Sequence, residues 1–157
     1  MAWLEALSHW PVAAALRQWV AAYALLNAAH ILGIGLLVGA IATLDLRLLG
    51  AFRGAALASL APPLSRVAAA GLLLALCTGA LLFSVRPVAY AQNAAFLAKL
   101  ALVALGILNA LLLRLGGGWR QMLEGAPVPA RIKIGAAFSL SIWVGAIICG
   151  RWIGFLQ

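Results

Sequence analysis

Four stretches of this chain are apolar for long enough to cross a lipid bilayer, and no other feature constrains the fold as strongly. They cover about residues 19–44, 67–85, 95–115 and 134–155. At about 1.5 Å of rise per residue, about 20 apolar residues in a helix span roughly 30 Å of bilayer hydrocarbon. The expected fold class is therefore all-α: residues 1–157 form a single transmembrane domain, an integral membrane four-helix bundle.

The composition agrees with a membrane protein. Hydrophobic residues make up 66% of the chain and charged residues only 9%, whereas about 25% of an ordinary soluble domain is charged. The mean hydropathy is +1.11. We therefore expect contact with a lipid bilayer. The formal net charge of +8 is interpreted as a signal of membrane topology and of attraction to anionic lipid, and not of nucleic-acid binding.

The basic residues between the spans predict which ends of the helices face the cytoplasm. With four spans, the two termini and the second loop share one face, and the first and third loops share the other. Basic loops remain in the cytoplasm, so both termini are expected in the periplasm of a bacterial inner membrane. The seven basic residues of the cytoplasmic loops are Arg47, Arg53, Arg66, Arg114, Arg120, Arg131 and Lys133, and the three of the other face are Arg17, Arg86 and Arg151.

The segment before the first span has its own pattern. About residues 3–17 place Trp3, Leu4, Leu7 and Trp10 at helical spacing, with polar side chains at the positions between them. This pattern predicts an amphipathic helix that lies in the membrane interface, bent or restarted at Pro11.

The connectors between the spans carry three further expectations. Pro62 and Pro63 are expected to prevent a continuous helix, so the second span is predicted to begin after them. Asp45 and Arg47 stand at the exit of the first span, where the pair is expected to anchor the helix end. The second connector, RPVAYAQN, is short and predicts that the second and third spans are antiparallel neighbours.

Small residues inside the spans favour close helix packing. Gly35 and Gly39 form a GxxxG step in the first span, a spacing that lets two helices approach closely. Packing within one chain and dimerisation explain this step equally well.

Few polar side chains lie inside the spans, and each one is a candidate for function because an ionisable group is costly in hydrocarbon. Asn27 and His30 are three residues apart and share one face of the first span. Lys99 lies in the third span and Arg151 in the fourth. All four fall in the outer half of the membrane, so we expect them to line a cationic cavity that opens towards the periplasm. The sequence leaves the direction of the Lys99 side chain open.

Two interpretations of His30 follow from the residues alone. A neutral imidazole beside the small residues Ala29 and Gly33 can ligate a haem iron or another metal ion. Lys99 and Arg151 would then suit the haem propionates.

In the other interpretation His30 only joins helices, through a hydrogen bond to Asn109, to Ser139 or to a backbone carbonyl. Copper has less support, because Cu(I) prefers several soft ligands and the chain has two methionines and two cysteines. Cys77 and Cys149 both fall inside spans, where they are interpreted as small buried apolar residues.

Several segments resemble known families. The stretches HILGIGLLVGAIATLDLRLLG, TGALLF, NAAFLAKLALVALGILNALLLR and IWVGAIICGRWIGF resemble a family of small bacterial four-span membrane proteins without assigned function, with DLRLLG as the most specific piece. More distantly, the chain is similar to the CopD copper-resistance family and to the HemJ-type protoporphyrinogen oxidases. In the HemJ family a histidine and a lysine in these places are functional and the protein binds haem b. The resemblance implies those roles for His30 and Lys99.

These observations predict a b-type haem-binding protein for redox or electron-transfer chemistry. His30 is the expected metal ligand, and Asn27, Lys99 and Arg151 are expected around the cofactor. The alternative is a non-enzymatic accessory or assembly subunit that packs against other membrane subunits or against copies of itself. Transport of copper or of a small solute is the third hypothesis.

Overall fold

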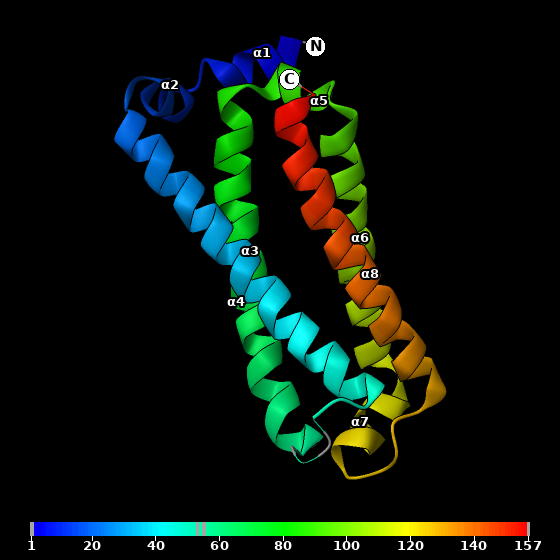
Figure 1. Ribbon diagram of the computed structural model, residues 1–157. Coiled ribbons are helices and arrows are strands. Elements are labelled where there is room, and N and C mark those ends of the chain that lie inside the picture. The colour runs from blue at the N-terminus through cyan, green and yellow to red at the C-terminus, as the bar shows by residue number, and fades with distance from the viewer. Residues whose placement is uncertain (1, 53, 55, 157) are drawn as a thin grey trace.

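The computed structural model describes residues 2–52, 54 and 56–156, and no strand occurs among them. Four helices are long: α3 (Val20–Leu49), α4 (Leu57–Val85), α6 (Ala94–Leu115) and α8 (Ala130–Trp152). Each is long and apolar enough to cross a membrane, and they run along the length of the molecule (Figure 1). The prediction of an all-α, multi-pass membrane protein is therefore confirmed. Arg53, one of the basic loop residues, lies outside the described residues.

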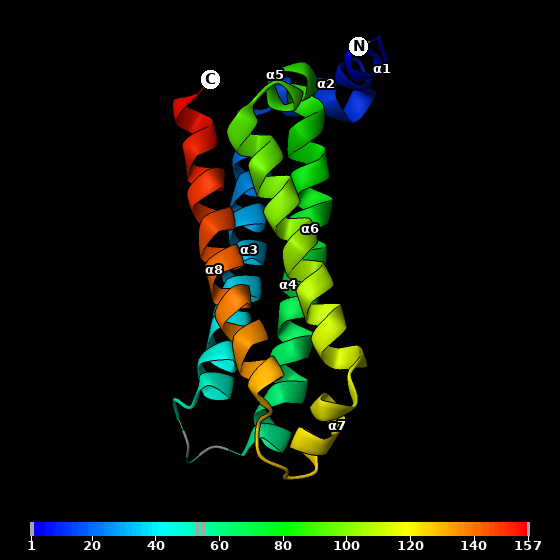
Figure 2. The same cartoon turned by 90° about the vertical axis from the view of Figure 1, so that its right-hand side faces the viewer.

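The shorter helices lie at the two ends of the long ones. α1 (Ala2–Ser8), α2 (Pro11–Gln18), α5 (Pro87–Ala91) and the 3₁₀ helix η1 (Ile153–Phe155) lie at one end, called here the α5 end. α7 (Gly117–Leu123) and the described connector residues 50–52, 54 and 56 lie at the other, the α7 end (Figures 1 and 2). The two termini and the second loop therefore share one end, as four spans require.

The N-terminal segment folds as two helices that meet at Pro11. Proline is favoured at the first position of a helix because its missing N–H would be unpaired there, and Pro11 opens α2 in this way. Arg17 then fixes the segment to the bundle. Its guanidinium donates to the carbonyl of Val85, the last residue of α4, at 3.2 Å, and to the carbonyl of Ser8, the last residue of α1.

The expectation that Pro62 and Pro63 prevent a continuous helix is wrong. α4 begins at Leu57 and contains both prolines in its second turn. A proline there leaves one carbonyl of the preceding turn without its N–H partner. The two carbonyls belong to Ala58 and Ser59, which are exposed like the prolines themselves, so solvent at the helix end can hydrogen-bond them. The helix therefore loses two internal bonds and continues.

α3 and α4 pack closely because glycines meet where the two helices cross. A Cβ atom on Gly71 would lie 2.5 Å from the backbone nitrogen of Leu37 and 2.7 Å from the carbonyl oxygen of Gly33. A Cβ atom on Gly33 would lie 2.8 Å from the backbone nitrogen of Ala75. Only glycine at these positions permits the observed backbone separation.

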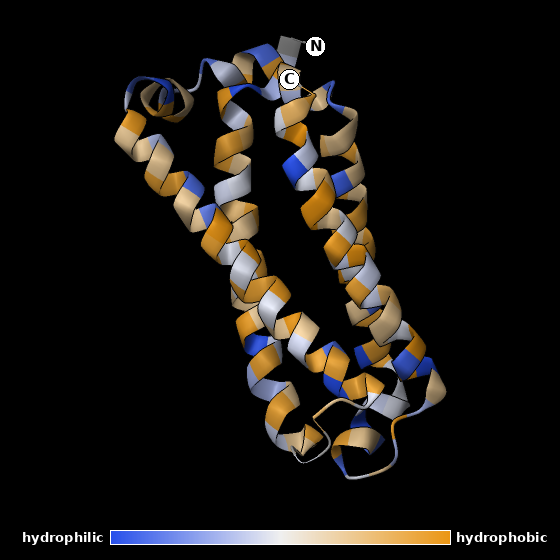
Figure 3. Ribbon diagram, in the orientation of Figure 1, coloured by the Kyte–Doolittle hydropathy of each residue, from blue (hydrophilic) through white to orange (hydrophobic). Residues whose placement is uncertain are grey.

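The predicted GxxxG step is not part of this contact. Gly35 and Gly39 are exposed, and a Cβ atom on either would have nothing within 4 Å. Many large apolar side chains face outward in the same way, including Leu25, Ile31 and Leu73, each more than half exposed. Apolar residues cover most of the surface of the long helices (Figure 3), as expected for contact with lipid.

α6 and α8 form the second close pair. A Cβ atom on Gly106 would lie 2.8 Å from the indole carbon Cζ2 of Trp143, so this glycine makes room for the ring. The Asn109 side-chain amide donates to the carbonyl of Gly135 at 3.0 Å. α8 also packs on α3, and this contact joins the two pairs.

The prediction that the second and third spans are packed neighbours is wrong along most of their length. Within the described residues α4 and α6 do not form a packed helix pair. They meet at the α5 end, where the rings of Phe83 and Phe96 stack at 5.4 Å between centroids and Tyr90 of α5 lies 5.4 Å from Phe96. α5 carries the chain across this end, so α4 and α6 need not pack side by side.

Candidate functional site

His30, the central candidate of the sequence analysis, is half-buried between α3 and α4. Its Nδ1 lies 3.0 Å from the hydroxyl oxygen of Thr78. That hydroxyl lies 2.6 Å from the carbonyl oxygen of Leu74, one turn earlier in α4. A hydroxyl has one proton, and a carbonyl can only accept, so Thr78 donates to Leu74 and accepts from His30.

This chain of hydrogen bonds fixes the tautomer of the neutral ring. Nδ1 carries the proton, so Nε2 carries the free lone pair and is the nitrogen that can bind a metal or accept a proton. Gly79 leaves room for the ring, since a Cβ atom there would lie 3.0 Å from Cε1 of His30. The expected partners Asn109 and Ser139 are not used, because both lie towards the α7 end of the bundle. The sequence alone did not identify Thr78 as the hydrogen-bond partner of His30.

Lys99 lies on α6, in the same half of the bundle as His30 on α3. The lysine is half-buried: its stem packs towards Gly150 of α8, where a Cβ atom would lie 3.5 Å from Cδ, and its ammonium nitrogen lies 5.9 Å from the centroid of the Phe96 ring. The structure therefore places the two residues to which the family resemblance assigns roles in the same half of the bundle, but on helices that do not form a packed pair within the described residues.

The other two predicted residues do not join this pair. Arg151 is exposed, and its guanidinium carbon lies 4.8 Å from the centroid of the Phe155 ring, four residues further along the chain. Asn27 is exposed, and its side chain has no hydrogen bond within the described part of the chain. Both remain on the α5 half of the bundle with His30.

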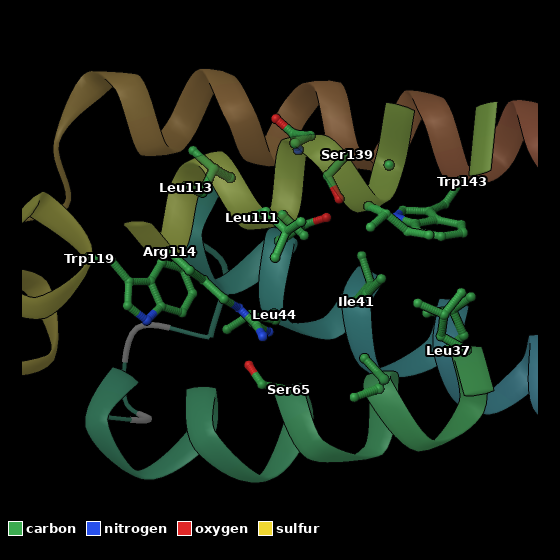
Figure 4. Close-up of a pocket in the computed structure, with 18 residues that line it drawn as sticks. Leu37, Ile41, Leu44, Ser65, Leu111, Leu113, Arg114, Trp119, Ser139 and Trp143 are labelled. Atoms are coloured by element: carbon green, nitrogen blue, oxygen red, sulfur yellow. The ribbon is translucent and has the colours of Figure 1, made fainter. Parts of the chain in front are cut away.

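A second site, which the sequence analysis did not predict, lies near the α7 end. A cavity of about 170 Å³ is enclosed by α3, α4, α6 and α8 (Figure 4). Its walls are mostly apolar. The polar or aromatic residues among those that line it are Asp45, Ser65, Asn109, Arg114, Trp119, Ser139 and Trp143.

Two buried polar atoms in this cavity have no partner. Asp45 is 5% exposed and Trp143 is 4% exposed, yet neither Oδ2 of Asp45 nor Nε1 of Trp143 has a hydrogen bond. Ser139 of α8 lies beside the Asp45 carboxyl. Most buried polar groups in proteins are paired, so an unpaired acceptor and an unpaired donor beside one cavity mark it as a candidate site.

The expectation that Asp45 only anchors the end of the first span is therefore wrong. α3 continues to Leu49, which places Asp45 one turn inside the helix and turns its side chain towards α8. The signal available in the sequence was the helical spacing of Leu37, Leu44 and Leu48, which puts Asp45 beside the buried face.

The cavity continues towards the α7 end. A second cavity of about 210 Å³ shares Ser65, Arg114 and Trp119 with the first. The Arg114 guanidinium lies 5.9 Å from the centroid of the Trp119 ring, and Figure 4 shows it reaching from α6 towards Leu44 and Ser65. None of the four residues His30, Lys99, Asn27 and Arg151 lines either cavity.

The described residues contain no group of three or more His, Cys, Asp or Glu side chains that could hold a metal ion. A haem iron needs no such group, since one axial histidine is enough to hold it. Cys77 is exposed and Cys149 is partly exposed, and both are free thiols, so the expectation that they are buried is wrong for Cys77.

Comparison of the chain with family models, with curated proteins and with solved structures gave no significant match.

Proposed function

We propose that this protein is a bacterial inner-membrane protein that binds a b-type haem through Nε2 of His30. The observation that carries the proposal is the hydrogen-bond chain from Nδ1 of His30 through Thr78 to Leu74. Metal-binding histidines almost always donate their other ring N–H to a fixed acceptor, which sets the tautomer and aims the free nitrogen at the metal. The donor chemistry of His30 therefore fits an axial haem ligand.

The surrounding residues support the same proposal. Lys99 and Arg151 are two cations in the same half of the bundle as His30, so both suit the anionic propionates. Asn27, one helical turn before His30, can donate a hydrogen bond to the same anionic edge. The resemblance to HemJ-type proteins points to the same histidine and lysine. A bound haem would supply one-electron chemistry, which we propose serves electron transfer.

The protein is proposed to have its α5 end in the periplasm. The connectors at the α7 end carry more basic residues than those at the α5 end, and basic connectors remain in the cytoplasm. In this orientation α1 and α2 lie in the outer interface as the predicted amphipathic segment, and His30 lies in the outer half of the membrane. Alkaline phosphatase fused to the C-terminus should be active, and an active cytoplasmic reporter there would reverse the orientation.

The haem proposal is tested by the absorbance spectrum of the detergent-purified protein after titration with haem. We expect a Soret band that is lost in His30→Ala. Thr78→Val removes the acceptor of Nδ1 while keeping the shape of the side chain, and loss of such a partner weakens metal binding by about 10- to 100-fold.

Thr43→Val is the matched control. The Thr43 hydroxyl also bonds to a carbonyl of its own helix, that of Gly39 at 2.8 Å, but it contacts no histidine. Its haem affinity should equal that of the unmodified protein. Haem that binds equally well to His30→Ala would refute the proposal.

The alternative function, an accessory or assembly subunit, rests on the same hydrogen bond interpreted as a link between α3 and α4. It predicts a colourless protein that does not bind haem and that copurifies with other membrane subunits in fixed ratio. The spectrum and the purified composition together decide between the two functions.

A further inference from the structure

The cavity near the α7 end has an opening to the membrane between α4 and α6. Its lining residues from these two helices include the exposed Ala69, Leu111 and Arg114, and α4 and α6 do not pack against each other along this stretch. An opening between two membrane-spanning helices faces lipid. A ligand of this cavity is therefore expected to be soluble in the bilayer.

The opening lies at the level where a membrane gives way to water. Asp45 is four residues from the end of α3, about 6 Å along the helix axis, and Arg114 is the second-last residue of α6. Polar head groups of amphiphilic molecules occupy this level of a bilayer. A molecule with a polar group and an apolar body can therefore enter here without crossing the hydrocarbon.

The two unpaired atoms define the polar group. Oδ2 of Asp45 needs a donor, and Nε1 of Trp143 needs an acceptor. Ser139 is the neighbour of Asp45 and lies one helical turn from Trp143, and Figure 4 shows the Ser139 hydroxyl and the nitrogen edge of the indole turned into the cavity. A hydroxyl group both donates and accepts, so it is the one simple group whose chemistry matches both atoms.

The remaining volume defines the body of the ligand. Leucine, isoleucine and alanine side chains of α3, α4 and α6 form most of the lining. A buried water molecule needs two to four polar partners. Water therefore suits the part of the cavity beside Asp45 and Ser139, and not the apolar remainder. A cavity of about 150 Å³ holds a benzene ring, and this one has about 170 Å³. The indole of Trp143, seated against Gly106, gives one wall that is aromatic.

We propose that this cavity binds a lipid-soluble phenol, of the size of a hydroquinone head group, whose hydroxyl donates to Asp45 and accepts from the indole N–H of Trp143. The site is separate from His30 and does not depend on haem. Binding requires no covalent or redox step.

Three probes that share a tolyl ring test the hydrogen bonds in the detergent-purified protein. 4-Methylphenol can donate and accept, 4-methylanisole can only accept, and toluene can do neither. Affinities are measured by ligand-observed NMR titration, and Ala69→Phe, which fills the opening, gives the baseline for partition into detergent. We expect 4-methylphenol to bind about 10-fold more tightly than toluene, the ratio expected for a net intramolecular-type hydrogen bond, with the ether between them.

Asp45→Leu identifies the acceptor. It keeps the approximate shape of the side chain and removes the carboxylate, so toluene should still bind while the preference for the phenol disappears. Retained toluene binding also shows that the cavity is intact. Trp143→Phe removes the donor together with part of the aromatic wall, so its effect is measured as the ratio of phenol to toluene affinity. That ratio should fall about fivefold, which tests the proposal even where Asp45→Leu does not fold. Ser141→Ala, an exposed hydroxyl bonded within α8, should change nothing.

The proposal is overturned by equal binding of the three probes, by a phenol preference that survives in Asp45→Leu, or by binding no stronger than in Ala69→Phe. The haem spectrum is independent of all three results, because His30 lines neither cavity.

Discussion

Replacing Gly71 with alanine should force α3 and α4 apart. The new Cβ would lie 2.5 Å from the backbone nitrogen of Leu37, and an ordinary contact begins at 3.4 Å, so the helices must separate locally by about 0.9 Å. Backbone cannot rotate away as a flexible side chain can. A gap of 0.5–1 Å forfeits a quarter to a half of each dispersion contact that it opens, and overpacking of this kind costs about 1–3 kcal/mol. Alanine returns about 0.4–1 kcal/mol of chain entropy, so the midpoints of the two ranges leave a net loss of about 1.3 kcal/mol.

Gly35→Ala is the matched control in the same crossing pair. A Cβ atom on Gly35 has nothing within 4 Å, so only the entropy gain remains and the variant should be stabilised by about 0.4–1 kcal/mol. The free energy of unfolding is measured by titrating the detergent-solubilised protein with a denaturing detergent and following helicity. Equal stability of Gly71→Ala and the unmodified protein would refute the steric argument. Equal loss in both variants would also refute it, because Gly35→Ala introduces no steric contact.

Three further changes test individual contacts. Arg17→Met removes the donor to the carbonyls that end α1 and α4, so amide hydrogen exchange should accelerate over residues 2–18 while the long helices keep their protection. Asn109→Leu removes the bond to the Gly135 carbonyl and should lower the free energy of unfolding by about 0.6 to 2 kcal/mol, the range for hydrogen bonds between membrane helices. Asn93→Ala removes the side-chain oxygen that accepts from the Phe96 N–H at the start of α6 and should cost about 1 kcal/mol, measured in the same unfolding titration.

The sequence predicts the four spans because hydropathy over about 20 residues decides whether a helix can lie in lipid, and no tertiary contact competes with that term. Helix ends are less predictable. Pro62 and Pro63 mark an interruption by local rules, but they stand where only two carbonyls lose their partners and where both are exposed. The cost is too small to end the helix there.

The functional sites could likewise be predicted only in part, because side-chain partners depend on how the helices pack. His30 could be singled out from the sequence because an imidazole in a span is costly and rare, but its partner Thr78 depends on how α3 crosses α4, and that crossing is set by Gly33 and Gly71. The burial of Asp45 could not be predicted in the same way, because its position near the end of the first span does not show whether its side chain lies between the helices. Its burial depends on Ser139 of α8, which is distant in the chain and is brought near only by the contact between α3 and α8.

The two close pairs, α3 with α4 and α6 with α8, are each a hairpin whose connector lies at the α7 end. Each hairpin has its own glycine contacts and can assemble as soon as its second helix leaves the ribosome. The cavity that holds Asp45 and Trp143 takes residues from both hairpins, so it comes into existence only when the second docks on the first. During biosynthesis a ligand of this cavity would therefore meet only finished molecules, and it would hold the two halves together as a non-covalent crosslink.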